Sequence, residues 1–189
     1  MGALLEKDLT TPEYYPLTLN ALQNACNQKS SREPVVNYDE ATVAQGLELL
    51  RQKQLALKVT GAGHRVEKYA HRLGEKLNLG RRDLALLCVL MLRGPQTVGE
   101  LRGRTERMHE FGDMEEVEHV LEALASLQPD PLTAPAARGR WVHLWSGAHV
   151  ESESGPEPVR SSLEQRVSTL ERELDELKRQ MESFRRQFE

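Results

Sequence analysis

The sequence predicts a mainly α fold with small β-hairpins, an α+β protein. Helix-forming residues (Leu, Ala, Glu, Arg and Gln) dominate the composition. Thr-Leu-Asn-Ala-Leu begins at Thr18 and Thr-Val-Gly-Glu-Leu begins at Thr97, each with a threonine cap before apolar residues three apart. A heptad pattern fills the C-terminal end. In both copies three helices and a hairpin follow in order, so we predict two tandem winged-helix domains and a C-terminal coiled-coil helix.

In the first copy, residues 2–8 are the end of a first helix. Two prolines prevent a regular helix over residues 10–16, and Tyr14 and Tyr15 are expected to lie partly in the core. The remaining predicted elements are a second helix over residues 17–28, a third from Tyr38 or Asp39 to about Gln54, and a hairpin wing with strands at 55–59 and 65–69 around a turn at 61–63.

The second copy repeats this order after a linker over residues 72–80, in which Gly74 and Gly80 are predicted helix stops. Its predicted elements are helices at 81–93, 97–108 and 114–127, a short proline-interrupted strand, a turn at 136–139 and a strand at 140–145. The third helices match, with apolar residues at Val43, Leu47 and Leu50 and at Val117, Leu121 and Leu124. Trp141 and Trp145 are expected to seal the core rather than to stack on bases.

The predicted domain bounds are 1–74, 75–146, a flexible linker over 147–160 and a coiled-coil helix over 161–189. The first helix of domain 1 is about half as long as its counterpart, so we expect it to be truncated and the chain to start late. Seven residues of the tail are predicted to form a dimerisation seam: Leu163, Val167, Leu170, Leu174, Leu177, Met181 and Phe184. Attractive flanking charges favour a parallel homodimer, and the alternative is a single helix packed on its own domains.

Composition limits the function classes. No apolar run is long enough for a membrane span, and Met1–Asp8 does not resemble a signal peptide, so a cytoplasmic protein without a membrane partner is expected. Cys26 and Cys88 are predicted to be buried thiols. The sequence has no Gly-rich phosphate loop, nucleophile elbow or metal-ligand spacing, so we predict no catalytic residues, no metal, no cofactor and no enzyme activity.

DNA binding is the usual role of a winged helix, and the first copy offers a local basic surface although the net charge is −4. The predicted nucleic-acid-binding residues lie on its loop, third helix and wing: Lys29, Ser30, Arg32, Thr42, Gln45, Arg51, Lys58, Arg65 and Lys68. Asp39, Glu40 and Glu48 on the same helix weaken this surface, and a solvated face of mixed charge is nearly as good an interpretation.

The third helix of the second copy carries four glutamates, so we predict that it does not enter a DNA groove. Arg102, Arg104, Arg107, Arg138 and Arg140 could still contact the DNA backbone. Two hypotheses follow: a dimeric, regulatory protein that binds double-stranded DNA through domain 1, which we favour, or an adaptor that binds a protein partner through domain 2 without binding DNA.

The N-terminal sequence also carries a family resemblance. Residues 10–22, from Thr10-Thr11-Pro12 to Ala21-Leu22, and the later Leu92–Leu101 string closely resemble the YceH family of uncharacterised bacterial proteins. The resemblance covers about residues 2–145. It implies tandem winged-helix domains and no established activity.

Overall fold

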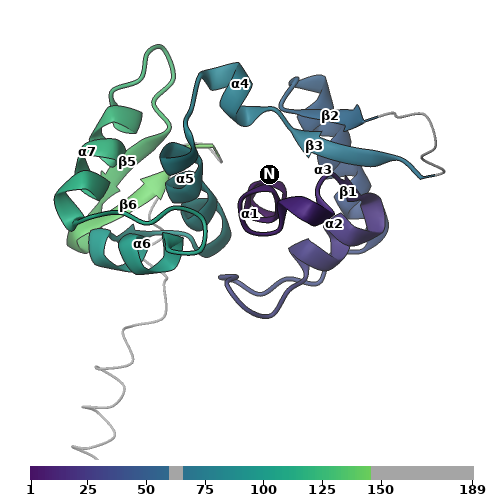
Figure 1. Ribbon diagram of the computed structural model, residues 1–189, viewed down its shortest axis with the longest axis horizontal. Coiled ribbons are helices and arrows are strands. Elements are labelled where there is room, and N and C mark those ends of the chain that lie inside the picture. The colour runs from purple at the N-terminus through teal and green to yellow at the C-terminus, as the bar shows by residue number, and fades with distance from the viewer. Residues whose placement is uncertain (60–65, 146–189) are drawn as a thin grey trace, which may run out of the picture. The chain divides into compact units, whose positions relative to one another are not determined.

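A computed structural model of the protein describes residues 1–59 and 66–145, all of which belong to one unit (Figure 1). These residues form a mixed α+β fold that is mostly helical, which confirms the mainly α, α+β part of the predicted fold class. The predicted wing turn at 61–63, Arg65, the linker over 147–160 and the tail with its seven dimerisation residues lie outside the described residues.

The first half contains three long helices and a three-stranded antiparallel sheet in the order β1-β3-β2. Its elements are α1 (Gly2–Thr10), the 3-10 turn η1 (Pro12–Tyr14), β1 (Leu17–Thr18), α2 (Leu19–Cys26), α3 (Glu40–Gln52), β2 (Ala56–Val59) and β3 (Lys68–His71). The central strand pairs Tyr69 with Leu17 on one side and with Lys58 on the other. The sheet therefore joins the segment before α2 to the hairpin after α3.

The second half has the same order of elements, with a sheet ordered β4-β6-β5. Its elements are α5 (Arg81–Arg93), β4 (Gln96–Thr97), α6 (Val98–Thr105), α7 (Met114–Ala125), β5 (Thr133–Ala136), the 3-10 turn η2 (Ala137–Gly139) and β6 (Arg140–His143). Trp141 and Trp145 are partly buried and pack against its core, as the sequence predicts. One arrangement of helices and strands thus occurs twice.

Polar caps at matched positions start the second and third helices of each half. The Thr18 hydroxyl accepts a hydrogen bond from the Ala21 N–H at 3.2 Å, and Thr97 and Glu100 cap α6 reciprocally. Asp39 and Asp113 each accept a hydrogen bond from the N–H three residues later, both at 2.8 Å. These caps explain why short threonine and aspartate signals could be found in the sequence.

The segment between the halves differs from its prediction. It contains a short helix, α4 (Leu73–Leu77), so Gly74 lies inside a helix rather than ending one. Asn78, with φ 53°, supplies the left-handed residue that ends α4. The N–H of Gly80 donates to the Asp83 carboxylate at 2.7 Å, so Gly80 precedes α5 instead of stopping a helix. The expectation for Tyr14 is also wrong, because its side chain is 73% exposed on the η1 turn.

Helix α1 lies between the two halves and contributes to both hydrophobic cores (Figure 1). Ala3 and Leu4 belong to the core of the first half, whereas Leu5 and Leu9 belong to the core that α5 dominates. Helices α1 and α5 approach closely, since a Cβ atom placed on Gly2 of α1 would lie 2.9 Å from Cγ and Cδ2 of Leu92 of α5. The apolar residues of α1 are therefore buried, although α1 is shorter than α5.

Candidate nucleic-acid interface

The loop before α3 is closed at its base by side-chain hydrogen bonds. Asn27 Nδ2 donates to the Tyr38 carbonyl and the Tyr38 N–H donates back to Asn27 Oδ1, both at 2.8 Å. Gln23 Nε2 adds a bond to the same carbonyl at 3.2 Å. This pairing brings Lys29 and Ser30, both exposed, close to the residue that precedes the N-terminus of α3.

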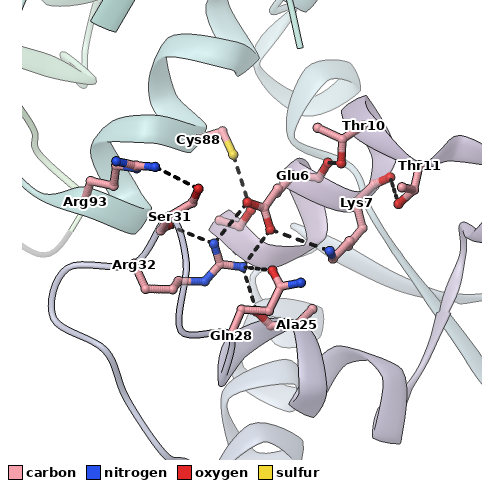
Figure 2. A network of polar contacts seen from close by, with 11 residues as sticks. Glu6, Lys7, Thr10, Thr11, Ala25, Gln28, Ser31, Arg32, Cys88 and Arg93 are labelled. Atoms are coloured by element: carbon pink, nitrogen blue, oxygen red, sulfur yellow. Dashed lines mark hydrogen bonds and ion pairs between the residues drawn. The ribbon is translucent and has the colours of Figure 1, made fainter. Parts of the chain in front are cut away.

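The prediction for Arg32 is corrected by the structure. Its side chain is 3% exposed and forms a two-pronged ion pair with Glu6 of α1, with Nη1···Oε1 at 3.0 Å and Nη2···Oε2 at 2.6 Å (Figure 2). The same guanidinium donates to the carbonyls of Ala25 and Ser31 and to the amide oxygen of Gln28. Arg32 holds the loop against α1 and cannot reach a DNA phosphate.

Two further predicted residues are engaged by carboxylates of the first half. Arg51 of α3 bonds Glu48 at 2.6 Å, one turn away on the same helix. Lys58 of β2 bonds Glu67, and the pKa of Glu67 is lowered by the hydrogen bonds that Lys58 and the Tyr69 hydroxyl donate to it. These pairs neutralise much of the positive charge that the sequence placed on α3 and the hairpin.

Three further predicted residues are exposed or partly exposed to solvent. Thr42 and Gln45 are exposed on α3, and Lys68 of β3 is partly exposed. The structure thus brings together a loop with Lys29 and Ser30 and a helix with Thr42 and Gln45, while Arg32, Arg51 and Lys58 have partners within the protein.

The equivalent helix of the second half is acidic. Glu115, Glu118 and Glu122 are exposed on α7, and Glu116 Oε2 accepts a hydrogen bond from the Gly112 N–H at 2.9 Å. A helix with these carboxylates would be repelled by phosphates in a DNA groove. The second half therefore has a different surface chemistry from the first, although the order of its elements is the same.

A group of three arginines lies where the loop meets the second half, and the sequence did not bring Arg93 together with Arg104 and Arg107. A pocket of about 60 Å³ is bordered by Arg93 at the end of α5, Arg104 of α6, Arg107 and Ser31. We call it the arginine pocket. Arg93 Nη2 donates to Ser31 Oγ at 2.7 Å (Figure 2). The spacing of Arg104 and Arg107, three residues apart, is the one local signal that could have suggested a shared face.

Arg93 also borders a wider, open hollow of about 760 Å³ that Glu100 and Arg140 line. Its charges are balanced, because Arg140 Nη1 lies 3.3 Å from Glu100 Oε2 and donates to the Pro95 carbonyl at 2.8 Å. Over residues 1–59 and 66–145, no three His, Cys, Asp or Glu side chains come together in a way that could hold a metal ion. None of the helices in this part has the length and apolar character that crossing a bilayer requires.

The fold and this surface define a mainly helical α+β protein built from one arrangement of elements used twice. The chain belongs to a family described as "Protein of unknown function, DUF480", whose model matches residues 1–139. The predicted resemblance to an uncharacterised bacterial family is confirmed.

Several UPF0502 proteins are similar to this chain. One from Opitutus terrae is 55% identical over 164 residues, which cover 84% of this chain and 71% of that protein. One from Citrifermentans bemidjiense is 57% identical over 158 residues, covering 81% and 73%. One from Shewanella piezotolerans is 46% identical over 187 residues, covering 89% and 86%.

Proposed function

We propose that the protein is a non-enzymatic, regulatory DNA-binding protein made of two winged-helix units, which contacts double-stranded DNA through its first half. Each half supplies the order of such a unit: a helix, a short strand, two helices and a pair of strands in one sheet. In helix-turn-helix units the recognition helix enters the major groove while neighbouring segments contact phosphates. In this chain those parts are α3 and the loop before it.

The observation that carries the proposal is the exposed polar surface formed by that loop and α3. The side chains of Lys29, Ser30 and Gln45 form no hydrogen bond or ion pair within the described part of the chain. The Asn27–Tyr38 pairing holds their two segments together at the base of the loop. Lys29 and Ser30 can therefore contact phosphates while Gln45 faces base edges.

The corrected residue set changes the expected binding energetics. With Arg32, Arg51 and Lys58 engaged by carboxylates, the predicted cations that remain for phosphates among the described residues are Lys29 and Lys68. Each phosphate contact contributes a slope of roughly −0.9 to a plot of log K against log salt concentration for duplex DNA. These two lysines therefore account for a slope of about −2, which is shallow for a DNA-binding protein.

Fluorescence anisotropy with mixed genomic duplex fragments, measured over a range of salt concentrations, tests the proposal. We expect binding at low salt, and Lys29→Ala combined with Lys68→Ala should weaken it on all sequences and flatten the slope by about 2. The charge-matched control combines Arg72→Ala with Arg82→Ala, which removes two exposed arginines around α4. Absence of binding at low salt, or equal losses in both double variants, would contradict the proposal.

Self-association is part of the proposal. The heptad residues Leu163, Val167, Leu170, Leu174, Leu177, Met181 and Phe184 are proposed to join two chains, so that a dimer presents two copies of the first half. Light scattering at micromolar concentration measures the mass in solution. We expect a dimer mass for the wild-type protein and a monomer mass for the variant that combines Leu170→Lys with Leu177→Lys. A monomer mass for the wild-type protein would contradict self-association.

The alternative is an adaptor that binds a protein and not DNA. It is favoured by α7, where Met114 is 56% exposed beside the exposed carboxylates of Glu115 and Glu118. An apolar side chain within an acidic face suits a partner with a basic, partly apolar surface. The same anisotropy experiment separates the two functions, because an adaptor would not bind duplex DNA even at low salt.

A further inference from the structure

The arginine pocket includes none of the residues through which the first half is proposed to contact DNA, and both halves of the protein build it. Glu6, Thr10 and Ser31 line it from the first half, and Arg93, Arg104 and Arg107 line it from the second. At about 60 Å³ it has room for one small anionic group and not for a base or a sugar. Its chemistry therefore depends on the hydrogen-bond donors and the charges around this space.

Several donors around the pocket have no acceptor. Nη1 of Arg104 is buried and bonds no group of the described protein. The Ser31 hydroxyl oxygen accepts its bond from Arg93, so its hydrogen is left to donate. Arg107 is exposed and forms no hydrogen bond or ion pair within residues 1–59 and 66–145. A buried guanidinium nitrogen without an acceptor is costly, because it has lost its hydrogen bonds to water and makes none within the protein.

Glu6 and Glu100 do not balance this positive charge, because both are engaged by other arginines. Both oxygens of Glu6 are held by Arg32. Glu100 is shared, since Oε1 lies 3.4 Å from Arg104 Nη2 while Oε2 lies 3.3 Å from Arg140 Nη1. Burial lowers the pKa of the Arg93 guanidinium and the like charge of Arg104 lowers it further, while the carboxylate of Glu33 opposes the shift only in part. The arginines of the pocket therefore repel one another, and an anion among them would relieve that repulsion.

We propose that the arginine pocket binds a phosphoryl group, either as inorganic phosphate or as the phosphate end of a small molecule. A phosphate dianion matches the site better than a carboxylate, because it offers more acceptor oxygens and more negative charge to three guanidinium groups and a hydroxyl. Ser31 precedes Arg32, whose ion pair holds the loop on α1, so the bound anion would tie that loop to α5 and α6. The phosphate would act as a bridge between the two halves of the protein.

Isothermal titration calorimetry of the full chain with inorganic phosphate, at constant ionic strength set with KCl, tests the proposal. We expect saturable binding of one phosphate per chain, weakened at least tenfold by Arg104→Gln and by Arg107→Gln. Arg138→Gln is the matched control, because it removes the same charge from an exposed arginine on the η2 turn. Phosphate at 100 times its Kd should also raise the wild-type Tm by roughly 5–10 °C over the same ionic strength of chloride.

The outcomes separate this site from the DNA interface. The phosphate site would be overturned if the wild-type protein gave no saturable heat, or if Arg104→Gln and Arg107→Gln both kept wild-type affinity for phosphate. Either result is independent of what the anisotropy experiment shows for Lys29 and Lys68. If phosphate does not bind but both pocket variants lose affinity for duplex DNA, the pocket contacts the nucleic-acid backbone, and the proposal of a free phosphoryl ligand is wrong. Because Arg107 is exposed, Arg107→Gln remains informative even if Arg104→Gln fails to fold.

Discussion

Arg32 and Glu6 form a bidentate ion pair across 26 residues of sequence, with nitrogen-to-oxygen distances of 3.0 and 2.6 Å. The pair joins the loop before α3 to α1, and it is shielded from water, since the two side chains are 3% and 14% exposed. Charge-assisted bonds of this geometry are strong, and each partner is costly to leave alone in a buried position. A residue that looked like a phosphate ligand in the sequence is thus a structural link.

Arg32→Ala should lower the free energy of unfolding by about 3–5 kcal/mol, because it leaves the Glu6 carboxylate without its buried partner. Urea unfolding followed by circular dichroism measures the difference. Arg51→Ala is the control, since its ion pair with Glu48 is solvent-exposed and should change stability by less than about 1 kcal/mol. Similar losses in the two variants would show that the Arg32–Glu6 pair does not stabilise the fold as described.

Elements with strong local signals were predictable from the sequence. Helix α5 has the predicted bounds, residues 81–93, because Gly80 precedes it and Gly94-Pro95 follows it. Strands β1 and β4 have two residues each and were not predicted, since they exist only through pairing with β3 and β6. A segment this short has no periodicity of its own to recognise.

The candidate site was less predictable, because its chemistry depends on contacts between distant residues. Lys29 and Gln45 are exposed as expected, but nothing near Arg32 in the sequence indicates its partner on α1. The arginine pocket combines the end of α5 with α6 and a loop from the other half. Such a group forms only when the two halves pack together.

Two glycines should respond in opposite ways to the same substitution. Gly2→Ala places a Cβ atom 2.9 Å from Leu92 and 3.2 Å from Met91 Cβ, so it should lower the free energy of unfolding by about 1–3 kcal/mol through overpacking between α1 and α5. Gly46 lies in α3 with nothing within 4 Å of its Cβ position, so Gly46→Ala should raise stability by about 0.5–1 kcal/mol. Denaturant unfolding of both variants measures whether each substitution raises or lowers the free energy of unfolding. A stabilising Gly2→Ala would contradict the close packing of α1 on α5.

Glu100 should make stability depend on pH. Its pKa is lowered below the ordinary 4.5, first by the hydrogen bond from the Thr97 N–H and then by the nearby charge of Arg140. A lowered folded-state pKa adds stability that is present above pH 4.5 and is lost as pH falls through the lowered pKa. Glu100→Gln should therefore cost about 0.3–1 kcal/mol at pH 7 and much less near pH 3. A difference between variant and wild type that is unchanged over this pH range would contradict the assignment.

The two thiols should react at different rates with iodoacetamide. Cys88 is fully buried, burial raises its pKa, and its Sγ donates to the Gly2 carbonyl at 3.5 Å. Cys26 is partly exposed, and burial raises its pKa as well. At pH 8 we expect slow modification of Cys26 and none of Cys88 until urea unfolds the protein, because the thiolate is the reactive form. Mass spectrometry measures the extent of modification at both cysteines. The Cys26→Ser variant should show no modification while it is folded.

Helix α1 places Leu4 in one core and Leu5 in the other, so no cut between the halves leaves both cores complete. The duplicated architecture therefore does not give two independently melting modules. Calorimetry should record a single cooperative transition for the described residues, and a cavity made by Leu22→Ala in the first half should lower the melting temperature of the second half equally. Heat, denaturant or a damaging substitution would act on the pair as one thermodynamic unit.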